Sequence, residues 1–382
     1  MTRLSILGIV LSAIVLGIGC ARGIAQYTSQ DLDLLPCETG ASPTFFQPLE
    51  FGDDGKPAYG QEQIDRILNQ VTPETKEVVV FVHGWNKNPR LAESDFSNFL
   101  CRMHGYIRQV AQERNMWLES EKGKRLLVVG VFWPSTWLPN SRDPFWLKPP
   151  SYFRMRARAD LIASGGLPEF LMSLSARMPP KGNLHLVGHS FGGRMLVHSL
   201  RHLLNVDPPQ LPSLLGRVGA LNVVLLNGAL PAEDFGWLLQ NIQATQSGRL
   251  APRISLASDA GLYNVHSFQD SANRILFPLA SAFGTDEAGC AAGACGVQDL
   301  STVCVDPLGR LPAAATASRQ ASATDKLAAW NIDATPIVFD HGDIYKGRVA
   351  RLVVDLLFRS DRDTLAKVAM GTGRPTRERC QP

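Results

Sequence analysis

The chain has 382 residues, of which 45% are hydrophobic and 19% are charged, a composition typical of an ordinary globular protein. Its 38 basic and 35 acidic residues nearly cancel and leave a formal net charge of +3. This balance gives no reason to expect nucleic acid as a partner.

The first 19 residues are predicted to be an export signal. Arg3 supplies a positive start, residues 4–18 are almost wholly apolar, and small residues follow. This apolar run is shorter than the roughly 20 residues that span a membrane comfortably. Cys20, the next residue, suggests a lipid anchor. The alternatives are plain secretion after cleavage of the signal and an uncleaved signal that acts as an anchor.

Cys20 follows the apolar run directly and resembles the lipidated cysteine of bacterial lipoproteins. The resemblance implies cleavage before Cys20 and a lipid anchor on its side chain. Ala21 stands where an aspartate would keep such proteins at the inner membrane. The resemblance therefore implies an outer-membrane location, facing the periplasm or the cell surface. Without the lipid, the protein would be periplasmic or secreted.

The cysteine count agrees with export. Setting Cys20 aside leaves an even number of cysteines, which outside the cytoplasm can form up to three disulfides. They are Cys37, Cys101, Cys290, Cys295, Cys304 and Cys380. Their connectivity stays open, because many pairings are possible. The spacing of the middle three does not match the close pairs of a zinc site, so no metal is predicted.

Residues 20–75 lack clear periodicity and are predicted to form an N-terminal tether or extension. The main domain is expected over residues 76–360, with a C-terminal tail over 361–382. Within it, apolar β-branched runs alternate with amphipathic helices. The predicted strands are EVVVFVHGW, RLLVVGVFW, NLHLV, ALNVVLLNG, LYNVHSF and TPIVFD. This alternation predicts an α/β fold with a doubly wound, mostly parallel sheet and helices on both faces.

Two stretches interrupt the alternation, at about residues 134–156 and 284–323. The second is rich in alanine and glycine and carries three cysteines, and it is predicted to be an excursion from the sheet. The first is rich in proline and aromatic residues and is predicted to be lid-like. The aromatic residues there are Trp133, Trp137, Phe145, Trp146, Tyr152 and Phe153. They could form an apolar acyl pocket or a lipid-facing surface, or they could simply pack the insertion onto the domain.

The segment GHSFGG, residues 188–193, lies between the predicted strand NLHLV and a predicted helix. A G-x-S-x-G sequence in this context is a nucleophile elbow, a tight turn that exposes the hydroxyl of Ser190 above the sheet. Gly188 and Gly192 are expected where a side chain would collide with a neighbouring strand or helix. His189 fills the position between the first glycine and the serine.

A serine hydroxyl needs a base to become a good nucleophile. Four histidines follow Ser190 in the chain. His198 and His202 lie two and three turns along the next helix and point away, and His266 lies inside a predicted strand. His341 follows the last predicted strand, at the same end of the sheet as the serine. The sequence therefore predicts that His341 is the base.

The acid that orients the base should lie between the serine and His341 in the chain. Asp270 follows LYNVHSF by two residues and fits best, although it could instead cap the helix after it. Asp234 is the main alternative and Asp259 the third. Asp340 adjoins His341 and cannot easily fold back onto its ring.

Two backbone N–H groups are expected to stabilise the oxyanion of the transition state. One is that of Phe191, directly after the nucleophile, and the other is that of Trp85, in the loop HGWNKN after the first buried strand. His83 in this loop is an alternative base. However, it precedes the serine in the chain, so a role in bracing the loop is favoured.

Together, FVHGW, GHSFGG, an acid after the penultimate strand and HGD after the last strand resemble the α/β-hydrolase superfamily, on its esterase and lipase side. FVHGWNKN with VFWPS resembles, more narrowly, a poorly characterised group of bacterial α/β hydrolases. The resemblance covers about residues 76–359. Members of the fold that use aspartate as nucleophile, the dehalogenases and epoxide hydrolases, are disfavoured by Ser190.

The resemblance implies a serine hydrolase that cleaves a carboxylic ester through an acyl-enzyme. Its substrate would be a small or lipid-like ester with an apolar acyl group, and no cofactor or metal is needed. An acyltransferase or a peptidase could use the same triad. A non-catalytic surface interaction protein on a hydrolase scaffold is the alternative of another class.

Overall fold

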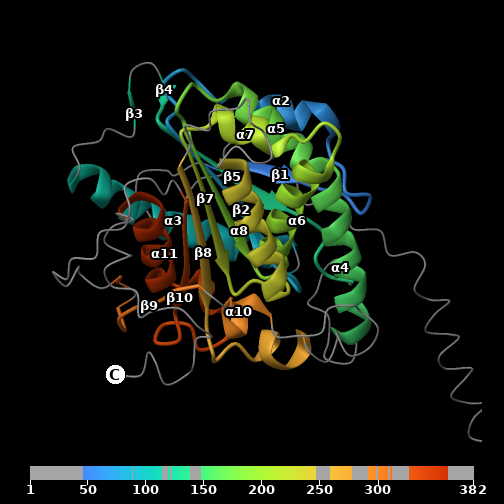
Figure 1. Cartoon of the computed structure of the whole chain (residues 1–382), viewed down its shortest axis with the longest axis vertical. Helices are drawn as coiled ribbons and strands as arrows, with labels where there is room; N and C mark the ends of the chain where they lie inside the picture. Colours follow the sequence, from blue (N-terminus) through green and yellow to red (C-terminus); the bar gives the residue numbers. More distant parts are fainter. Residues whose placement is uncertain are drawn as a thin grey trace, which may run out of the picture.

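The computed structural model describes residues 46–87, 89–113, 119–120, 123–137, 148–246, 259–277, 291–297, 300–308, 310–311 and 327–359. Its centre is a parallel eight-stranded sheet with the order β1-β5-β2-β6-β7-β8-β10-β9 (Figure 1). The strands are β1 Gln47–Glu50, β2 Glu77–Val82, β5 Leu126–Phe132, β6 Asn183–His189, β7 Ala220–Leu226, β8 Asp259–His266, β9 Thr302–Cys304 and β10 Leu327–Asp333. Strands β3 (Glu119–Ser120) and β4 (Gly123–Lys124) form a separate antiparallel pair.

Helices cover both faces of this sheet. They are α2 Gly60–Leu68, α3 Pro89–Glu113, α4 Lys148–Ser164, α5 Gly166–Arg177, α6 Phe191–Asn205, α7 Leu211–Arg217, α8 Ala232–Gln246, α10 Ala292–Cys295 and α11 Gly347–Val354. Shorter turns of helix are η3 (Ala272–Leu276), η4 (His341–Tyr345) and η5 (Asp355–Arg359). Figure 1 shows α3 and α11 on one side of the sheet and α4, α6 and α8 on the other. Within the described ranges, no helix is both long and apolar enough to cross a membrane.

Strand β2 shows why the sheet is buried on both faces. Val80 and Val82 belong to the core cluster that contains Leu196 of α6. Phe81 points to the opposite face, where its ring centroid lies 4.9 Å from that of Phe96 in α3. Because side chains alternate between the two faces of a strand, a strand that is apolar throughout suits a sheet covered on both sides. The predicted doubly wound, parallel α/β fold is confirmed.

Both edges of the sheet differ from the prediction. Strand β1 and helix α2 fall within residues 20–75, which the sequence analysis assigns to an extension, yet β1 pairs with β5. Strand β9 falls within the second predicted insertion, residues 284–323, yet it pairs with β10. Helix α10 of the same insertion packs at the end of β8, where the Asn264 amide donates to Ala292 O at 2.9 Å. Part of each segment therefore belongs to the domain.

The prediction of the last strand is wrong. Strand β10 has the sequence LAAWNID and ends at Asp333, whereas the sequence analysis placed a strand at TPIVFD, residues 335–340. The N–H groups of Ile337 and Val338 both donate to Ala334 O at 2.9 Å, so this segment is a turn. Pro336 has no N–H to donate to a neighbouring strand, which disfavours a place inside the sheet. His341 therefore follows a turn and begins η4.

Several predicted features lie outside the described residues. These are the export signal, Cys20, the tail over 361–382 and part of both insertions, including Phe145 and Trp146. Cys37, Cys290 and Cys380 also lie outside the described residues, so the disulfide connectivity stays a prediction. The remaining cysteines, Cys101, Cys295 and Cys304, each take part in a disulfide.

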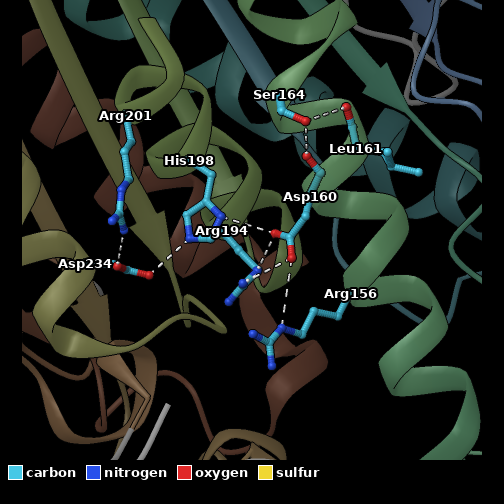
Figure 2. A network of polar contacts seen from close by, with 8 residues as sticks. All are labelled: Arg156, Asp160, Leu161, Ser164, Arg194, His198, Arg201 and Asp234. Atoms are coloured by element: carbon cyan, nitrogen blue, oxygen red, sulfur yellow. Dashed lines mark hydrogen bonds and ion pairs between the residues drawn. The ribbon is translucent and has the colours of Figure 1, made fainter. Parts of the chain in front are cut away.

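A polar network joins α4, α6 and α8 on one side of the sheet (Figure 2). The two ring nitrogens of His198 in α6 contact two carboxylates, Nδ1 lying 3.1 Å from Asp160 Oδ1 and Nε2 lying 3.0 Å from Asp234 Oδ2. Arg194 Nε donates to Asp160 Oδ1 at 2.8 Å, and Arg201 donates to Asp234 Oδ1 at 3.0 Å. Since carboxylates only accept, both nitrogens of His198 carry a proton in this arrangement. We name these five residues the histidine clamp.

The clamp changes the pKa values of its members. Burial lowers the pKa of His198, but the hydrogen bonds to Asp160 and Asp234 outweigh burial and raise it above 6.5. Burial raises the pKa of Asp160, but the hydrogen bond from His198 and the charge of Arg194 outweigh burial and lower it to about 2. At pH values between the pKa of Asp160 and that of His198, the Asp160 carboxylate and the His198 imidazolium are therefore charged together.

The clamp predicts a pH-dependent stability. A histidine whose folded-state pKa is raised stabilises the fold fully below pH 6.5, and this contribution disappears as the pH rises through the folded-state pKa. We expect His198→Gln to lower the free energy of unfolding by about 1 kcal/mol at pH 6, a modest value because solvent screens the partly exposed Asp160. The difference from wild type should shrink toward pH 9. Urea denaturation across this pH range measures it.

His202→Gln is the matched control, because His202 lies one turn further along α6 and its ring makes no ion pair among the described residues. Its unfolding curve should follow that of the wild type at every pH. A His198→Gln deficit that is constant from pH 6 to pH 9 would contradict the charged clamp.

Candidate active site

Ser190 occupies a strained backbone conformation between β6 and α6. Its φ is 55° and its ψ is −121°, values that L-residues with a side chain rarely adopt. Hydrogen bonds hold the turn on both sides: Ser190 N donates to Leu226 O at 3.0 Å, and Ser190 O accepts from Gly193 N at 3.0 Å and from Ala229 N at 3.1 Å. The turn therefore has the position and the strain of a nucleophile elbow.

The glycines of the elbow are required by close approaches of the backbone. A Cβ on Gly192 would lie 2.1 Å from Val82 O in β2, and a Cβ on Gly188 would lie 2.6 Å from Gly193 N. Neither contact can be relieved without moving backbone. The predicted reason for these two glycines is confirmed.

The structure brings His341 and Asp270 together. His341 Nδ1 lies 2.8 Å from Asp270 Oδ2, and the acid is fully buried while the histidine side chain is 20% exposed. Burial lowers the pKa of His341, but the charge and hydrogen bond of Asp270 outweigh burial and raise it above 6.5. The Asp270 carboxylate thus favours the charged form that a base reaches during catalysis, and it leaves Nε2 for the serine proton.

The His341 turn reaches the elbow itself. The ring nitrogen Nε2 of His189 lies 3.1 Å from His341 O, directly beside Ser190. No hydrogen bond between Ser190 Oγ and the His341 ring occurs in the described part of the chain. In active sites without substrate such contacts are often long, and they shorten when the substrate binds.

Asp270 is itself held by Asn273, a residue that sequence reasoning missed. The backbone N–H of Asn273 donates to Asp270 Oδ1 at 3.1 Å, and its amide donates to Asp270 Oδ2 at 2.9 Å and to Asn227 O at 2.7 Å. Asn273 therefore ties the acid to the loop after β7. The first of these contacts also agrees with the alternative role of Asp270 as a cap for the following helix.

The other acids considered from the sequence have different surroundings. Asp234 binds His198 and Arg201 in the clamp (Figure 2). Asp259 is the first residue of β8, at the end of the parallel sheet opposite to Ser190. Asp340 accepts a hydrogen bond from the backbone N–H of His341 at 2.7 Å and makes none with its ring.

The other histidines are also placed away from this role. His198 belongs to the clamp, and His202 lies further along α6. His266 is fully buried at the end of β8, where both of its ring nitrogens lack a partner among the described residues. Burial lowers the pKa of His266, and the charge of Asp333 opposes this effect only in part.

His83 braces the loop after β2. Its Nδ1 donates to Gly84 O at 2.8 Å, and its Nε2 accepts from Trp133 N at 3.2 Å. The indole of Trp133 donates in return to His83 O at 2.9 Å. Burial lowers the pKa of His83 to about 4, so the ring is neutral near pH 7. Both ring nitrogens are thus engaged within the loop.

The side chains of the two residues predicted to donate to the oxyanion pack against each other. The rings of Trp85 and Phe191 have centroids 6.1 Å apart, and no described residue accepts a hydrogen bond from either backbone N–H. Phe191 begins α6, where the helix dipole adds a partial positive charge. Two unpaired N–H donors next to a strained serine are what an oxyanion requires.

Aromatic side chains from α4 pack against both of these residues. The Tyr152 ring lies 5.1 Å from Phe191 and 5.8 Å from Trp85, and the Trp85 indole donates to Ser151 Oγ at 3.1 Å. Tyr152 is buried, whereas Phe153 is 37% exposed. At least one aromatic residue of the first insertion therefore packs the start of α4 onto the site.

A serine hydroxyl on a strained turn, a histidine paired with a buried acid, and two backbone N–H donors are the groups that acyl transfer requires. Across the described ranges, no group of three or more histidines, cysteines or acidic residues is arranged to hold a metal ion. Besides Asn273, Tyr345, whose hydroxyl lies 3.4 Å from His189 Nδ1, has no signal in the sequence, and no role was predicted for His189 beyond its place in the elbow. The one feature of the sequence that could have indicated a role for His189 is its position directly before Ser190.

No family model matches the sequence, and no curated protein matches it significantly. The crystal structure of the gene lin2722 products from Listeria innocua is 10% identical with a TM-score of 0.33, covering 75% of this chain and 95% of that chain. A lipase-esterase related protein from Clostridium acetobutylicum is 11% identical with a TM-score of 0.26, covering 75% of this chain and 97% of its own. The α/β-hydrolase-type fold therefore rests on the parallel sheet, its two helical layers and the turn after β6.

Proposed function

We propose that this protein is a serine hydrolase that cleaves a carboxylic ester, with Ser190 as nucleophile, His341 as base and Asp270 as orienting acid. One observation carries the proposal: His341 pairs with the buried Asp270, and its carbonyl contacts His189, the neighbour of a serine in a strained turn. Strain of this kind clusters at functional sites.

In the proposed reaction, Ser190 Oγ attacks the ester carbonyl carbon while His341 Nε2 takes the hydroxyl proton. The carbonyl oxygen becomes an oxyanion and accepts hydrogen bonds from the N–H groups of Trp85 and Phe191. The carbon–oxygen bond to the alcohol then breaks, and His341 returns the proton to the departing alcohol. Water repeats the sequence on the acyl-enzyme and releases the acid.

The surroundings of the two donors favour an apolar acyl group. The rings of Tyr152, Trp85 and Phe191 form one aromatic cluster around the proposed oxyanion donors, and Trp85 is its partly exposed member. Phe153 extends this surface toward solvent. An acyl chain that packs on such rings would gain roughly 0.8 kcal/mol for each methylene that it buries. We therefore propose a lipid-like or other apolar acyl ester as substrate.

We also propose export and a lipid anchor at Cys20, on the sequence pattern of the first 21 residues. Expression of the full chain in a bacterium fed an alkyne-tagged fatty acid tests this. Wild type should carry the tag and fractionate with the outer membrane, whereas Cys20→Ala should lose the tag. A tag that persists in Cys20→Ala would contradict the assigned anchor site.

The proposed nucleophile is tested with a fluorophosphonate probe, which reacts with activated serines. We expect labelling of wild type on the peptide that contains Ser190. Labelling and hydrolysis of p-nitrophenyl butyrate should both fall at least about 10³-fold in Ser190→Ala and in His341→Ala, because nucleophile and base act as a unit.

Ser199→Ala is the matched control, because Ser199 is fully buried on the helix that follows Ser190 and its hydroxyl has no partner among the described residues. It should label like wild type. A folded wild type without any labelling would count against the hydrolase and in favour of an interaction protein. Labelling with acyl transfer to amines or alcohols faster than to water would indicate the acyltransferase instead.

The raised pKa of His341 predicts the pH profile. The base must be neutral to act, so kcat/KM should fall as the pH drops through the pKa of His341, with a midpoint above 6.5. In Asp270→Asn the carboxylate that raises this pKa is gone, so the midpoint should move to lower pH. The rate should also fall by on the order of 10³ to 10⁴. Stopped-flow or plate assays from pH 5 to pH 9 measure both. A midpoint unchanged in Asp270→Asn would exclude Asp270 as the orienting acid.

A further inference from the structure

His189 contacts the backbone of the proposed base. It is the last residue of β6, directly before Ser190, and it is 1% exposed. Its Nε2 lies 3.1 Å from His341 O, and the two ring centroids are 4.8 Å apart. A carbonyl oxygen can only accept, so Nε2 carries the hydrogen in this bond. The contact fixes the distance between the turn that holds the serine and the turn that holds the base.

The other ring nitrogen contacts the far end of the same turn. His189 Nδ1 lies 3.4 Å from the hydroxyl of Tyr345, the last residue of η4, and the two rings pack edge to face at 5.5 Å. With Nε2 protonated, a neutral His189 can only accept at Nδ1, so the tyrosine hydroxyl donates. His189 therefore contacts η4 at its first residue, His341, and at its last.

The loop with the proposed oxyanion donor lies on another side of the ring. A Cβ on Gly84 would lie 2.8 Å from His189 Nδ1 and 2.8 Å from Ser190 Cβ. The loop before Trp85 can approach so closely because residue 84 has no side chain. One imidazole thus touches three segments that the reaction requires: the elbow, the oxyanion loop and the η4 turn.

His189 is suited to this position because it stays neutral. Burial, and then the neighbouring charge of His341, lower the pKa of His189 well below 6.5. A neutral ring keeps one donor and one acceptor across the pH range in which His341 titrates. It also adds no charge that would repel the imidazolium form of the base.

We infer that His189 is a positioning residue, which holds His341 at the elbow through its Nε2–H bond to the His341 carbonyl. The role rests on the proposed function, since it serves the placement of the base relative to Ser190. His189 touches neither substrate nor reacting atoms; it acts through the backbone of the base. Displacement of a reacting group by about 1 Å can cost on the order of 100-fold in rate.

Two substitutions of equal length separate the hydrogen bond from the volume of the side chain. In His189→Gln, the amide nitrogen is the same number of bonds from Cβ as Nε2 and can donate to His341 O. In His189→Met, the side chain has a similar reach but no donor. Neither changes the charge of the site, so any effect on His341 comes from geometry. Tyr345→Phe is a third variant, which keeps the ring and removes the hydroxyl that His189 accepts from.

We expect His189→Met to lower kcat for p-nitrophenyl butyrate by about 10- to 100-fold, with KM changed less than about threefold, because ground-state binding does not use this residue. His189→Gln should recover most of the loss, and Tyr345→Phe should show a smaller loss in kcat. His202→Met, on the helix that follows the serine but away from the turn, should behave as wild type.

A second readout does not need activity. NMR of histidine labelled at Cε1, with His341 assigned from the spectrum of His341→Ala, gives the pKa of His341 directly. In His189→Met this pKa should fall toward 6.5 as the Asp270 contact loosens, and in His189→Gln it should stay raised. If wild type neither labels nor hydrolyses while these shifts occur, the proposed function fails, although His189 still holds the His341 turn.

The inference is overturned by either of two results. One is a His189→Met protein that folds and retains both wild-type kcat and the raised pKa of His341. The other is a His189→Gln protein as impaired as His189→Met, because the donor would then be irrelevant. If His189→Met does not fold, the pKa of His341 is compared among wild type, His189→Gln and Tyr345→Phe by the same NMR titration. An unchanged pKa of His341 in Tyr345→Phe would then count against the role.

Discussion

The close approach of the α6 amino terminus to strand β2 is the constraint on which the site depends. Gly192 lies so near Val82 that even a methyl group would overlap the strand carbonyl. This approach forces the chain through a turn in which Ser190 has a positive φ, at a cost of about 1–3 kcal/mol. Backbone hydrogen bonds from β7 and from the first turn of α6 hold the turn in place. The serine is therefore pre-arranged by the packing of the sheet and needs no ligand to reach its conformation.

The histidine clamp secures the same helix from its other side. Arg194 lies one turn after the serine; its N–H bonds to Ser190 O at 3.3 Å and its guanidinium to Asp160 of α4. Helix α4 in turn brings Tyr152 against the oxyanion residues. The elbow is thus fixed between β2 on one side and charged contacts to α4 on the other. Because the clamp residues do not touch Ser190 Oγ or His341, their effect on the reaction is through the position of the helix.

The central strands and the elbow could be predicted from the sequence, because both have strong local patterns. EVVVFV is apolar at almost every position, and GHSFGG joins a strand to a helix. The edge strands β1 and β9 are only four and three residues long, and they become strands because they pair with β5 and β10. Such pairing is a long-range contact that local periodicity does not report. The error at residues 335–340 has the same origin: an apolar run resembled a strand, while Pro336 and the hydrogen bonds to Ala334 make it a turn.

Within the site, residue types and chain order are sufficient to nominate Ser190, Asp270 and His341, but they cannot rank the remaining polar residues. Asp234 and Asp270 look alike in the sequence, and only the packing of α4, α6 and α8 shows that the first is committed to His198. The adjacent rings of His189 and His341 also have roles that the sequence cannot distinguish. Both rings are shielded from most solvent, yet burial and the charge of His341 lower the pKa of the first, whereas Asp270 raises that of the second. One imidazole can therefore take up a proton while its neighbour serves as a neutral support, and this division of roles arises from where a single carboxylate lies.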